Sequence, residues 1–319
     1  MDRFSAHMDR AWDLIGKGEM IQALVAAKRA LEIDEESPEV HNLIGYIYAM
    51  DGDFEEAISN YRQAMTLDEY YIEPVLNIAE LLIHSDIDSE EAVRLCRRVA
   101  EIVSEPEEIV EAILLEADAL INMGDLEGAR ERLDDIEKPE LLPTTYTILL
   151  GRALYEVGDS QAAKPFLERS VAEEPASGDA WYYYGQVARD EGRRVDAVRA
   201  FQNVLLADAK EPSPPWAKYL EPIEPLVRQA IGTLKEEERT LLDDTEVVVT
   251  NSPSEQQVDD EIDPRQMVLA EGIDPERGAF RRLWVFVRNL SRAGVLPHSA
   301  KEDLAEMILH ELKPRTGIV

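Results

Sequence analysis

The chain has 319 residues, and 33 Lys and Arg against 66 Asp and Glu give a formal net charge of −33 at pH 7. This length suffices for two modest domains, and 45% hydrophobic residues fit a packed chain better than a disordered one. Nucleic acids and anionic membrane surfaces are not expected partners, because both require clustered Lys and Arg. The single cysteine, Cys96, excludes an internal disulfide.

The N-terminal region carries no recognisable targeting signal. Residues 1–20 mix apolar and charged side chains and lack the apolar core of a signal peptide. No run of about 18 apolar residues occurs that could form a membrane-spanning helix. We therefore expect a cytoplasmic protein without membrane insertion.

A short pattern recurs over the first two thirds of the chain, in which a glycine is followed five residues later by an alanine. The clear copies have their glycines at Gly18, Gly52, Gly124, Gly158 and Gly192. Gly18 and Gly52 lie 34 residues apart, and so do the last three glycines. A less regular copy falls at the turn of residues 85–88, so that six copies span about residues 4–209.

Each copy is predicted to form two antiparallel helices joined by a tight turn, because apolar residues recur at spacings of three and four on both sides of the glycine. In the second copy, Gly45 and Ala57 allow the two backbones to approach, while Tyr48 and Tyr61 fill the space beside them. Such a hairpin buries its apolar stripe only by stacking on its neighbours, so the sequence predicts a helical solenoid.

The period and the alternation of small and large residues resemble the tetratricopeptide repeat (TPR) family. The residues that carry this resemblance are Ala79, Leu82, Ala117, Leu120, Gly151, Leu154, Pro175, Trp181, Gly185 and Phe201. The resemblance implies a mainly α-helical fold, with a right-handed solenoid of about six hairpins over residues 1–209. It also implies a concave groove, lined by the first helix of each hairpin, that holds a peptide or a partner helix.

Projection of the first helices predicts which side chains face this groove. They are Asn42, Tyr46, Asn77, Glu80, His84, Asp118, Asn122, Arg152, Tyr155, Tyr182 and Arg189. The set lacks the lysine, asparagine and arginine clamp with which chaperone-binding TPR proteins grip a terminal carboxylate. We expect a protein or peptide partner that is neutral to basic and has apolar anchors; the alternative for each residue is a solvated or packing role.

The 34-residue spacing stops at Glu211, and a different pattern follows the prolines of residues 212–215. An amphipathic helix from about residue 216 to 233 is expected to cap or link the repeats over residues 210–235. Two strands, a mobile loop and a final helix are then expected at Glu246–Thr250, Leu283–Val287, Ser254–Asp263 and about Ala300–Leu312.

This order of elements, with Ile308-Leu309-His310-Glu311 on the last helix, resembles the minimal zincin-like metallopeptidases. The resemblance implies a small α+β domain over residues 236–319. Zincins bind zinc with two histidines of a His-Glu-x-x-His helix, and the glutamate serves as general base. His310 and Glu311 match the first histidine and the glutamate, but Pro314 stands in the place of the second histidine.

The function predicted from the sequence is a TPR scaffold or adaptor whose metallopeptidase-like C-terminal domain is an inactive pseudoenzyme, with no cofactor. One alternative is a zinc-dependent metallopeptidase whose repeats recruit substrate, with His310 as a metal ligand and Glu311 as general base. That alternative needs further zinc ligands, for which His298 is a candidate. A second alternative is a structural subunit of a homo-oligomer.

Overall fold

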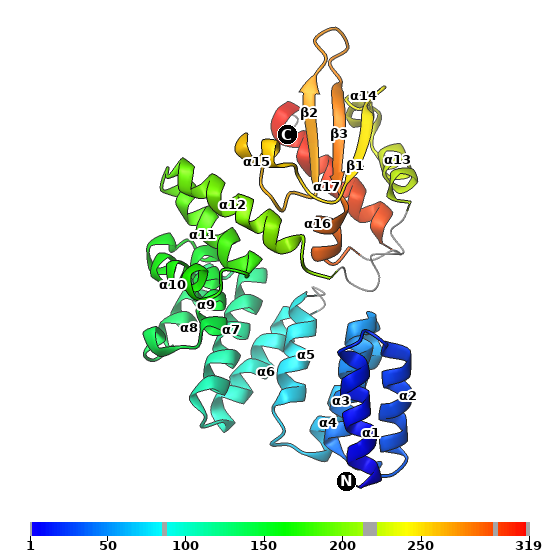
Figure 1. Cartoon of the computed structure of the whole chain (residues 1–319), viewed down its shortest axis with the longest axis vertical. Helices are drawn as coiled ribbons and strands as arrows, with labels where there is room; N and C mark the ends of the chain where they lie inside the picture. Colours follow the sequence, from blue (N-terminus) through cyan, green and yellow to red (C-terminus); the bar gives the residue numbers. More distant parts are fainter. Residues whose placement is uncertain (1, 85–87, 213–221, 296–298, 317–319) are drawn as a thin grey trace. The chain divides into compact units, whose positions relative to one another are not determined.

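The chain divides into two compact units, Met1–Pro175 and Ala176–Val319 (Figure 1). The structure is a computed structural model that describes residues 2–84, 88–212, 222–295 and 299–316. None of the described helices is both long enough and apolar enough to cross a membrane.

Unit 1 is made of helical hairpins that follow one another along the chain (Figure 1). Its helices are α1 (Arg3–Ile15), α2 (Met20–Leu31), α3 (Pro38–Asp51), α4 (Phe54–Leu67), α5 (Glu73–His84), α6 (Ser89–Ile102), α7 (Pro106–Asn122), α8 (Leu126–Asp134), α9 (Thr144–Glu156) and α10 (Ser160–Glu173). A short 3-10 turn at Pro139–Leu141 precedes α9. These five hairpins coincide with the first five copies of the sequence repeat, and the turn at residues 85–87 lies outside the described residues.

The recurring glycine ends the first helix of a hairpin, and the following residue begins the second. Gly52 adopts the left-handed conformation at φ 85°, which a side chain disfavours. Asp53 then caps α4, because its carboxylate accepts a hydrogen bond from the amide of Glu56 at 3.4 Å. Gly45 fits against the ring of Tyr61, where a β-carbon would lie only 2.6 Å from a ring carbon. The pattern therefore sets both the turn and the closeness of the two helices.

Unit 2 contains the sixth hairpin together with an α+β domain. Its elements are α11 (Gly178–Asp190), α12 (Arg194–Asp208), α13 (Ile223–Thr233), α14 (Glu236–Thr240), β1 (Glu246–Thr250), α15 (Glu255–Asp259), β2 (Val268–Ile273), β3 (Phe280–Phe286), α16 (Val287–Arg292) and α17 (Ala300–Thr316). The three strands form one sheet in the order β1-β3-β2. β3 is parallel to β1 and antiparallel to β2.

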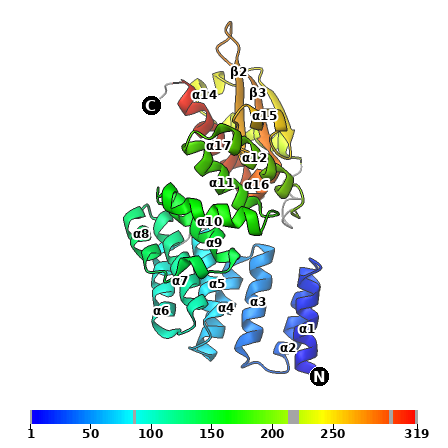
Figure 2. The ribbon, with the colours of Figure 1, turned by 60° about the vertical axis from the view of Figure 1, so that its left-hand side comes forward.

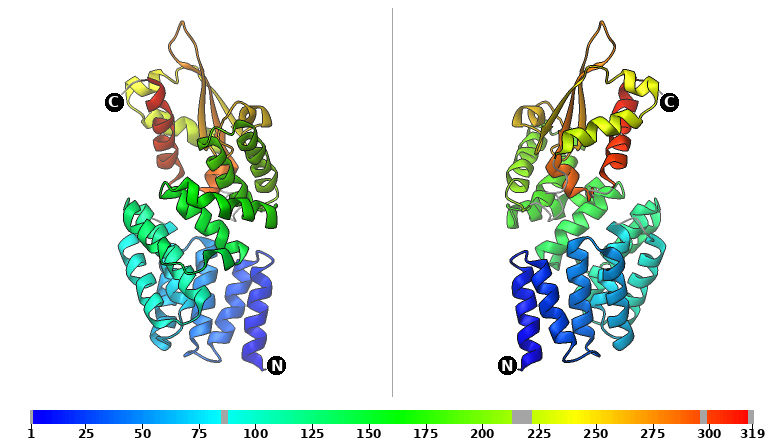
Figure 3. Two further views of the ribbon diagram at one scale, coloured as in Figure 1. Left: turned by 90° about the vertical axis from the view of Figure 1, so that its left-hand side faces the viewer. Right: turned by 90° about the vertical axis from the view of Figure 1, so that its right-hand side faces the viewer.

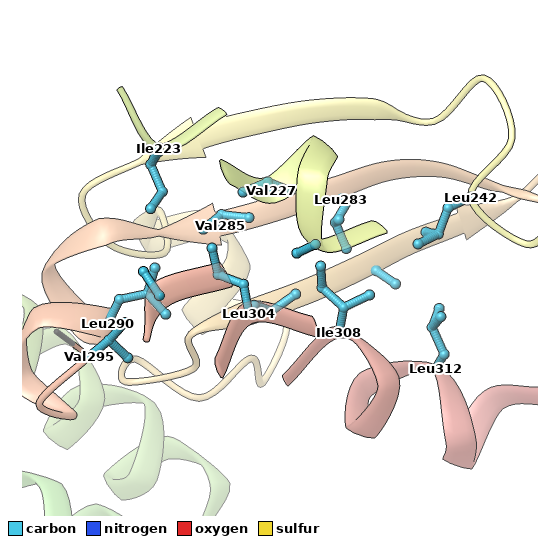
Figure 4. Packing of buried hydrophobic residues seen from close by; sticks show 14 of the residues in the cluster. Ile223, Val227, Leu242, Leu283, Val285, Leu290, Val295, Leu304, Ile308 and Leu312 are labelled. Carbon is cyan, nitrogen blue, oxygen red and sulfur yellow. The ribbon is translucent and has the colours of Figure 1, made fainter. Parts of the chain in front are cut away.

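α13 and α17 pack against each other and against the sheet (Figure 3). The core between them is apolar and well buried (Figure 4). Leu304, Ile308 and Leu312 recur every four residues along α17 and are almost completely buried, facing Leu283 and Val285 of β3. The apolar stripe of the last helix therefore covers the sheet, as its period indicates.

Some boundaries differ from the sequence prediction. The repeats end at Asp208, close to the predicted residue 209, but the sixth hairpin groups with the C-terminal residues, so the compact units divide after Pro175. The helix expected from about residue 216 to 233 is described from Ile223 to Thr233, whereas residues 216–221 lie outside the described residues. Its Val227 is buried in the α+β core. The final helix continues to Thr316 and does not end at Leu312.

The strands and the expected loop also differ in part. β1 has the predicted bounds, whereas β3 begins three residues earlier than expected, at Phe280, and Val287 begins α16. β2 was not predicted as a strand; its first three residues are buried and its last three exposed, which is neither the alternating pattern nor a continuous apolar run. The expected loop of residues 254–263 contains the helix α15, and its Val258 is fully buried.

Candidate binding groove

The first helices of neighbouring hairpins lie next to one another in unit 1. α5 contacts both α3 and α7, and α7 contacts α9 (Figure 2). Side chains on the shared side of these helices therefore converge from separate repeats, as in the groove that the TPR resemblance implies.

A hollow of about 500 Å³ opens on α5, α7 and the start of α9. We call it the acidic groove. It is lined by Leu76, Asn77, Glu80, Glu107, Glu111, Leu114, Leu115, Asp118, Pro143, Thr145, Tyr146, Leu149 and Arg152. This volume falls within the range of small-molecule and side-chain binding sites.

The groove combines an apolar floor with a negative lining. Leu76 and Leu114 are buried at its base, and Tyr146 adds a half-buried ring. Four carboxylates face one guanidinium, and that guanidinium, of Arg152, is hydrogen-bonded to Asp118. The remaining charge favours a cationic ligand with an apolar portion.

The crowding of carboxylates changes the protonation of groove residues. Burial raises the pKa of Glu111 above its ordinary value, and the charges of Glu80 and Glu73 raise it further. Burial also raises the pKa of the Tyr146 hydroxyl, with a contribution from Glu111. A cation beside Glu111 would stabilise the charged form of this carboxylate.

The structure brings four of the predicted groove residues together in this hollow: Asn77, Glu80, Asp118 and Arg152. Sequence projection missed Glu107, Glu111 and Tyr146, which also line it. The signal was present, because Glu107 and Glu111 lie three and two turns before Asp118 on the same helix, at spacings built from steps of three and four.

Three predicted amide side chains hold repeats together. Asn42 is buried at 3% exposure, where its side chain accepts a hydrogen bond from Asn77 at 3.0 Å and donates one to the Tyr71 hydroxyl at 3.0 Å. Asn122 donates to the backbone carbonyl of Ile83 at 3.1 Å. The buried Asn42 is therefore corrected from a ligand contact to a link between α3 and α5.

The remaining predicted residues of unit 1 lie elsewhere along the first helices. Tyr46 packs on Trp12 of α1, with ring centroids 5.6 Å apart, so these two rings form an aromatic pair that projection of single repeats missed. Tyr155 is half-buried on α9. His84 is the last residue of α5, and its side chain lies outside the described part of the chain.

The two predicted residues of the sixth hairpin are engaged within unit 2. The Tyr182 hydroxyl donates to the Asp263 carboxylate at 3.1 Å, and a guanidinium nitrogen of Arg189 lies 4.0 Å from the same carboxylate. Burial and the charge of Asp263 together raise the pKa of Tyr182. Tyr182 and Arg189 therefore contact Asp263, which belongs to a later segment of the same chain.

His310 and Glu311 border a second hollow, of about 690 Å³, between α17 and the residues that lead into β2. Glu311 accepts a hydrogen bond from the backbone amide of Ala270 at 3.0 Å and one from the Gln266 side chain at 3.1 Å. Its carboxylate thus joins α17 to β2, and His310 is exposed on the rim.

These residues do not fit a zincin zinc site. Among the described residues, no three side chains of His, Cys, Asp or Glu gather in a way that could hold a metal ion. Both oxygens of Glu311 accept hydrogen bonds within the domain, whereas a general base must face a water molecule. His298 lies outside the described residues.

Family models and solved structures agree on the repeat. One tetratricopeptide repeat model matches residues 38–71 and another matches residues 148–214. No curated protein sequence matches the chain.

Three solved structures with this fold are informative. PilF of Pseudomonas aeruginosa is 16% identical and covers 66% of this chain and 93% of its own, with a TM-score of 0.53. The type IV pilus biogenesis factor PilW is 14% identical and covers 65% of this chain and 94% of its own, with a TM-score of 0.55. A tetratricopeptide repeat protein from Parabacteroides merdae is 13% identical and covers 96% of this chain and 99% of its own, with a TM-score of 0.53. The chain therefore contains tetratricopeptide repeats, which the family models match over residues 38–71 and 148–214, and a small α+β region accompanies them.

Proposed function

We propose that this protein is a TPR scaffold that holds a basic peptide, or a basic helix of a partner protein, in the acidic groove. The observation that supports this function is the convergence of Glu80, Glu107 and Glu111 over a floor of leucines. A lysine or arginine side chain can place its charge among the carboxylates while its methylene groups lie on the floor. An apolar residue beside it would fill the remaining space near Tyr146.

The charge of the groove, and not only that of the whole protein, should determine the affinity. The test is fluorescence anisotropy with a short labelled peptide of alternating lysine and leucine, in which the double variant Glu80→Gln/Glu111→Gln replaces two carboxylates by amides of similar shape. We expect its affinity to fall at least tenfold, because two groove carboxylates are lost.

A matched control removes two carboxylates from α6 and α8, which are the second helices of their hairpins. Glu101 of α6 and Glu131 of α8 are exposed and do not line the groove. The double variant Glu101→Gln/Glu131→Gln should bind the peptide within about twofold of the wild type, because exposed charges are screened by salt. Equal losses in the two double variants would mean that the peptide responds to net charge alone, and the groove would then not be the site.

We infer that the α+β domain serves binding and not peptide hydrolysis. This inference rests on the engagement of Glu311 with β2 and on Pro314, which stands in the place of a second histidine. After dialysis against trace zinc, the wild type and a His310→Ala variant should contain the same background of metal. One zinc per chain that disappears in the variant would instead favour the metallopeptidase.

A further inference from the structure

Residues 254–265 run across the α11–α12 hairpin, and we call them the acidic segment. They include α15, which contacts α12 (Figure 1). Ser254 caps α15 by accepting a hydrogen bond from the amide of Gln257 at 3.2 Å, and the Gln257 side chain in return accepts one from the Ser254 amide at 2.9 Å. This capping box gives the segment a defined conformation before its contacts with the hairpin are considered.

One apolar side chain anchors the segment. Val258 is fully buried, and it packs in a cluster with Ala188, Ala197, Phe201 and Val204 of the hairpin. Burial of this side chain removes apolar surface from water, which stabilises the contact. The anchor is therefore comparable to the single buried side chains by which peptides are held in grooves.

Carboxylates on alternate residues then meet polar side chains of α12. The Asp259 carboxylate accepts a hydrogen bond from Gln202 at 2.9 Å. The Glu261 carboxylate lies 2.6 Å from the guanidinium of Arg194. The hydrogen bond and the ion pair are both exposed to solvent, so they contribute to the selectivity of the contact more than to its stability.

The third carboxylate of the segment, that of Asp263, contacts the first helix of the hairpin, α11. The contact is at the position that faces the groove in unit 1. Asp263 accepts hydrogen bonds from Tyr182 at 3.1 Å and from Gln186 at 2.9 Å. Gln186 follows Arg152 by the 34-residue period of the repeat, and Arg152 in turn follows Asp118 by the same interval. The acidic segment thus contacts the sixth hairpin at the residue equivalent to two groove residues of unit 1.

The segment ends at Arg265, which binds two carboxylates of the hairpin. The Arg265 guanidinium is only 13% exposed, and it forms a two-pronged hydrogen bond with Asp208, with both donor–acceptor distances at 3.1 Å, and an ion pair with Asp179 at 2.6 Å. It also lies over the ring of Tyr182, 4.7 Å from the ring centre. This contact fixes the direction in which the segment crosses the hairpin.

We propose that the sixth hairpin carries a second peptide-binding face, specific for an acidic segment with one apolar anchor, and that the chain's own residues 254–265 occupy it. This face differs from the acidic groove in its charge pattern: Arg189 and Arg194 lie beside carboxylates of the segment, and Asp179 and Asp208 hold the arginine at its end. Covalent attachment gives the internal segment an effective concentration of the order of millimolar, so an external peptide must compete with it. A partner with a similar acidic segment would bind by displacing residues 254–265.

The proposal is tested with the full chain and a labelled synthetic peptide that has the sequence of residues 254–265. In an opened variant, Val258→Asp/Glu261→Arg, the internal segment loses its anchor and one charge contact. The peptide should bind the opened variant at least tenfold more tightly than it binds the wild type. Equal affinities for the two proteins, with unchanged helical content, would overturn the proposal.

Charge reversal provides the control for the face itself. In the single variant Val258→Asp, which keeps Glu261, adding Arg194→Glu should weaken binding of the peptide about tenfold, and a peptide that carries Glu261→Arg should recover most of the loss. Loss of affinity without recovery would mean that Arg194 does not contact this position of the peptide. The lysine and leucine peptide of the acidic groove is a separate probe, so failure of one proposal does not affect the other.

If the opened variant does not fold, hydrogen exchange can instead show whether Arg194 holds residues 254–265 on the hairpin. The amides of Val258 and Ile262 donate to the carbonyls of Ser254 at 3.1 Å and Gln257 at 2.9 Å. Exchange at these amides should be at least threefold faster in Arg194→Glu than in the wild type, and the added change Glu261→Arg should restore the slow rate. Unchanged exchange in Arg194→Glu would overturn the proposal.

Discussion

Glu116 of α7 is a fully buried carboxylate that two arginines share. Its two oxygens accept hydrogen bonds from Arg97 at 2.7 Å and from Arg132 at 2.8 Å. A buried charge of this kind is tolerated only when it is paired, and removal of one partner leaves the other uncompensated. The contact joins α6, α7 and α8, and α7 is one of the helices that line the acidic groove.

Replacement of this carboxylate should destabilise unit 1 more than replacement of an arginine does. Glu116→Ala is expected to lower the free energy of unfolding by about 3 kcal/mol. Arg97→Ala is the control, and it should cost about 1 kcal/mol or less, because the Arg97 side chain is 59% exposed. Urea unfolding followed by circular dichroism measures both, and similar small losses would show that Glu116 is not a structural charge.

Cys96 packs in the same region, on α6. Burial, with the charges of Glu116 and Asp118, raises the pKa of its thiol to about 12. Because the thiolate is the reactive form, alkylation by iodoacetamide at pH 8 should be at least a hundredfold slower in the native protein than in urea. Mass spectrometry measures the rates, and rapid alkylation of the native protein would show that the thiol is accessible.

Glu111 links stability to binding. Its pKa is raised in the folded state, so its contribution to stability is present while it is protonated and is lost as the pH rises through that raised pKa. Glu111→Gln is therefore expected to raise the urea midpoint at pH 8, with a smaller change at pH 4, while it weakens the binding of the lysine and leucine peptide. A lower midpoint at pH 8 would mean that Glu111 makes a favourable contact in the folded protein.

The helical hairpin is the element that the sequence predicted best. Its turn requires a residue at positive φ, which leaves a glycine in the sequence, and its crossing requires a small residue, which is glycine in some copies and alanine in others. The second crossing illustrates the packing, because Gly45 lies against the ring of Tyr61.

Substitution of this glycine tests the packing directly. Gly45→Ala should cost about 2 kcal/mol, because the new β-carbon would lie 2.6 Å from a carbon of the Tyr61 ring, and overpacking of this kind is destabilising. Gly16→Ala is the matched control: its φ is −60° and its new β-carbon would come no nearer than 3.7 Å to the atoms around it. It should be neutral or slightly stabilising, and equal costs at the two glycines would contradict the close crossing.

Elements whose contacts are distant in sequence were predicted less well. Residues 254–263 are mostly polar and acidic, a composition typical of a loop, but their partners on α11 and α12 lie 57 to 81 residues earlier in the chain. Nothing in the local pattern shows that Val258 has an apolar cluster to enter. Asn42 was assigned to the groove for the same reason, because projection of one helix does not reveal that the next repeat covers it.

At the scale of the whole molecule we propose two peptide-binding faces, one in each unit: the acidic groove, and the face of the sixth hairpin that holds residues 254–265. The projected groove residues predicted a neutral to basic partner, and they could not predict that Arg189 and Arg194 lie beside an acidic segment of the same chain. The candidate site was predicted in part: Glu80, Asp118 and Arg152 do lie together, while Glu107, Glu111 and Tyr146 were found only once α7 and α9 were placed side by side. If both proposals hold, the chain would join a basic partner and an acidic one.

A hydrogen-exchange footprint with the lysine and leucine peptide shows whether the acidic groove holds a basic segment. We expect slower exchange in α5, α7 and α9 at saturating peptide, with α2, α4 and unit 2 unchanged. Protection confined to α2, α4, α6, α8 and α10, or to unit 2, would mean that the peptide binds elsewhere than in the groove.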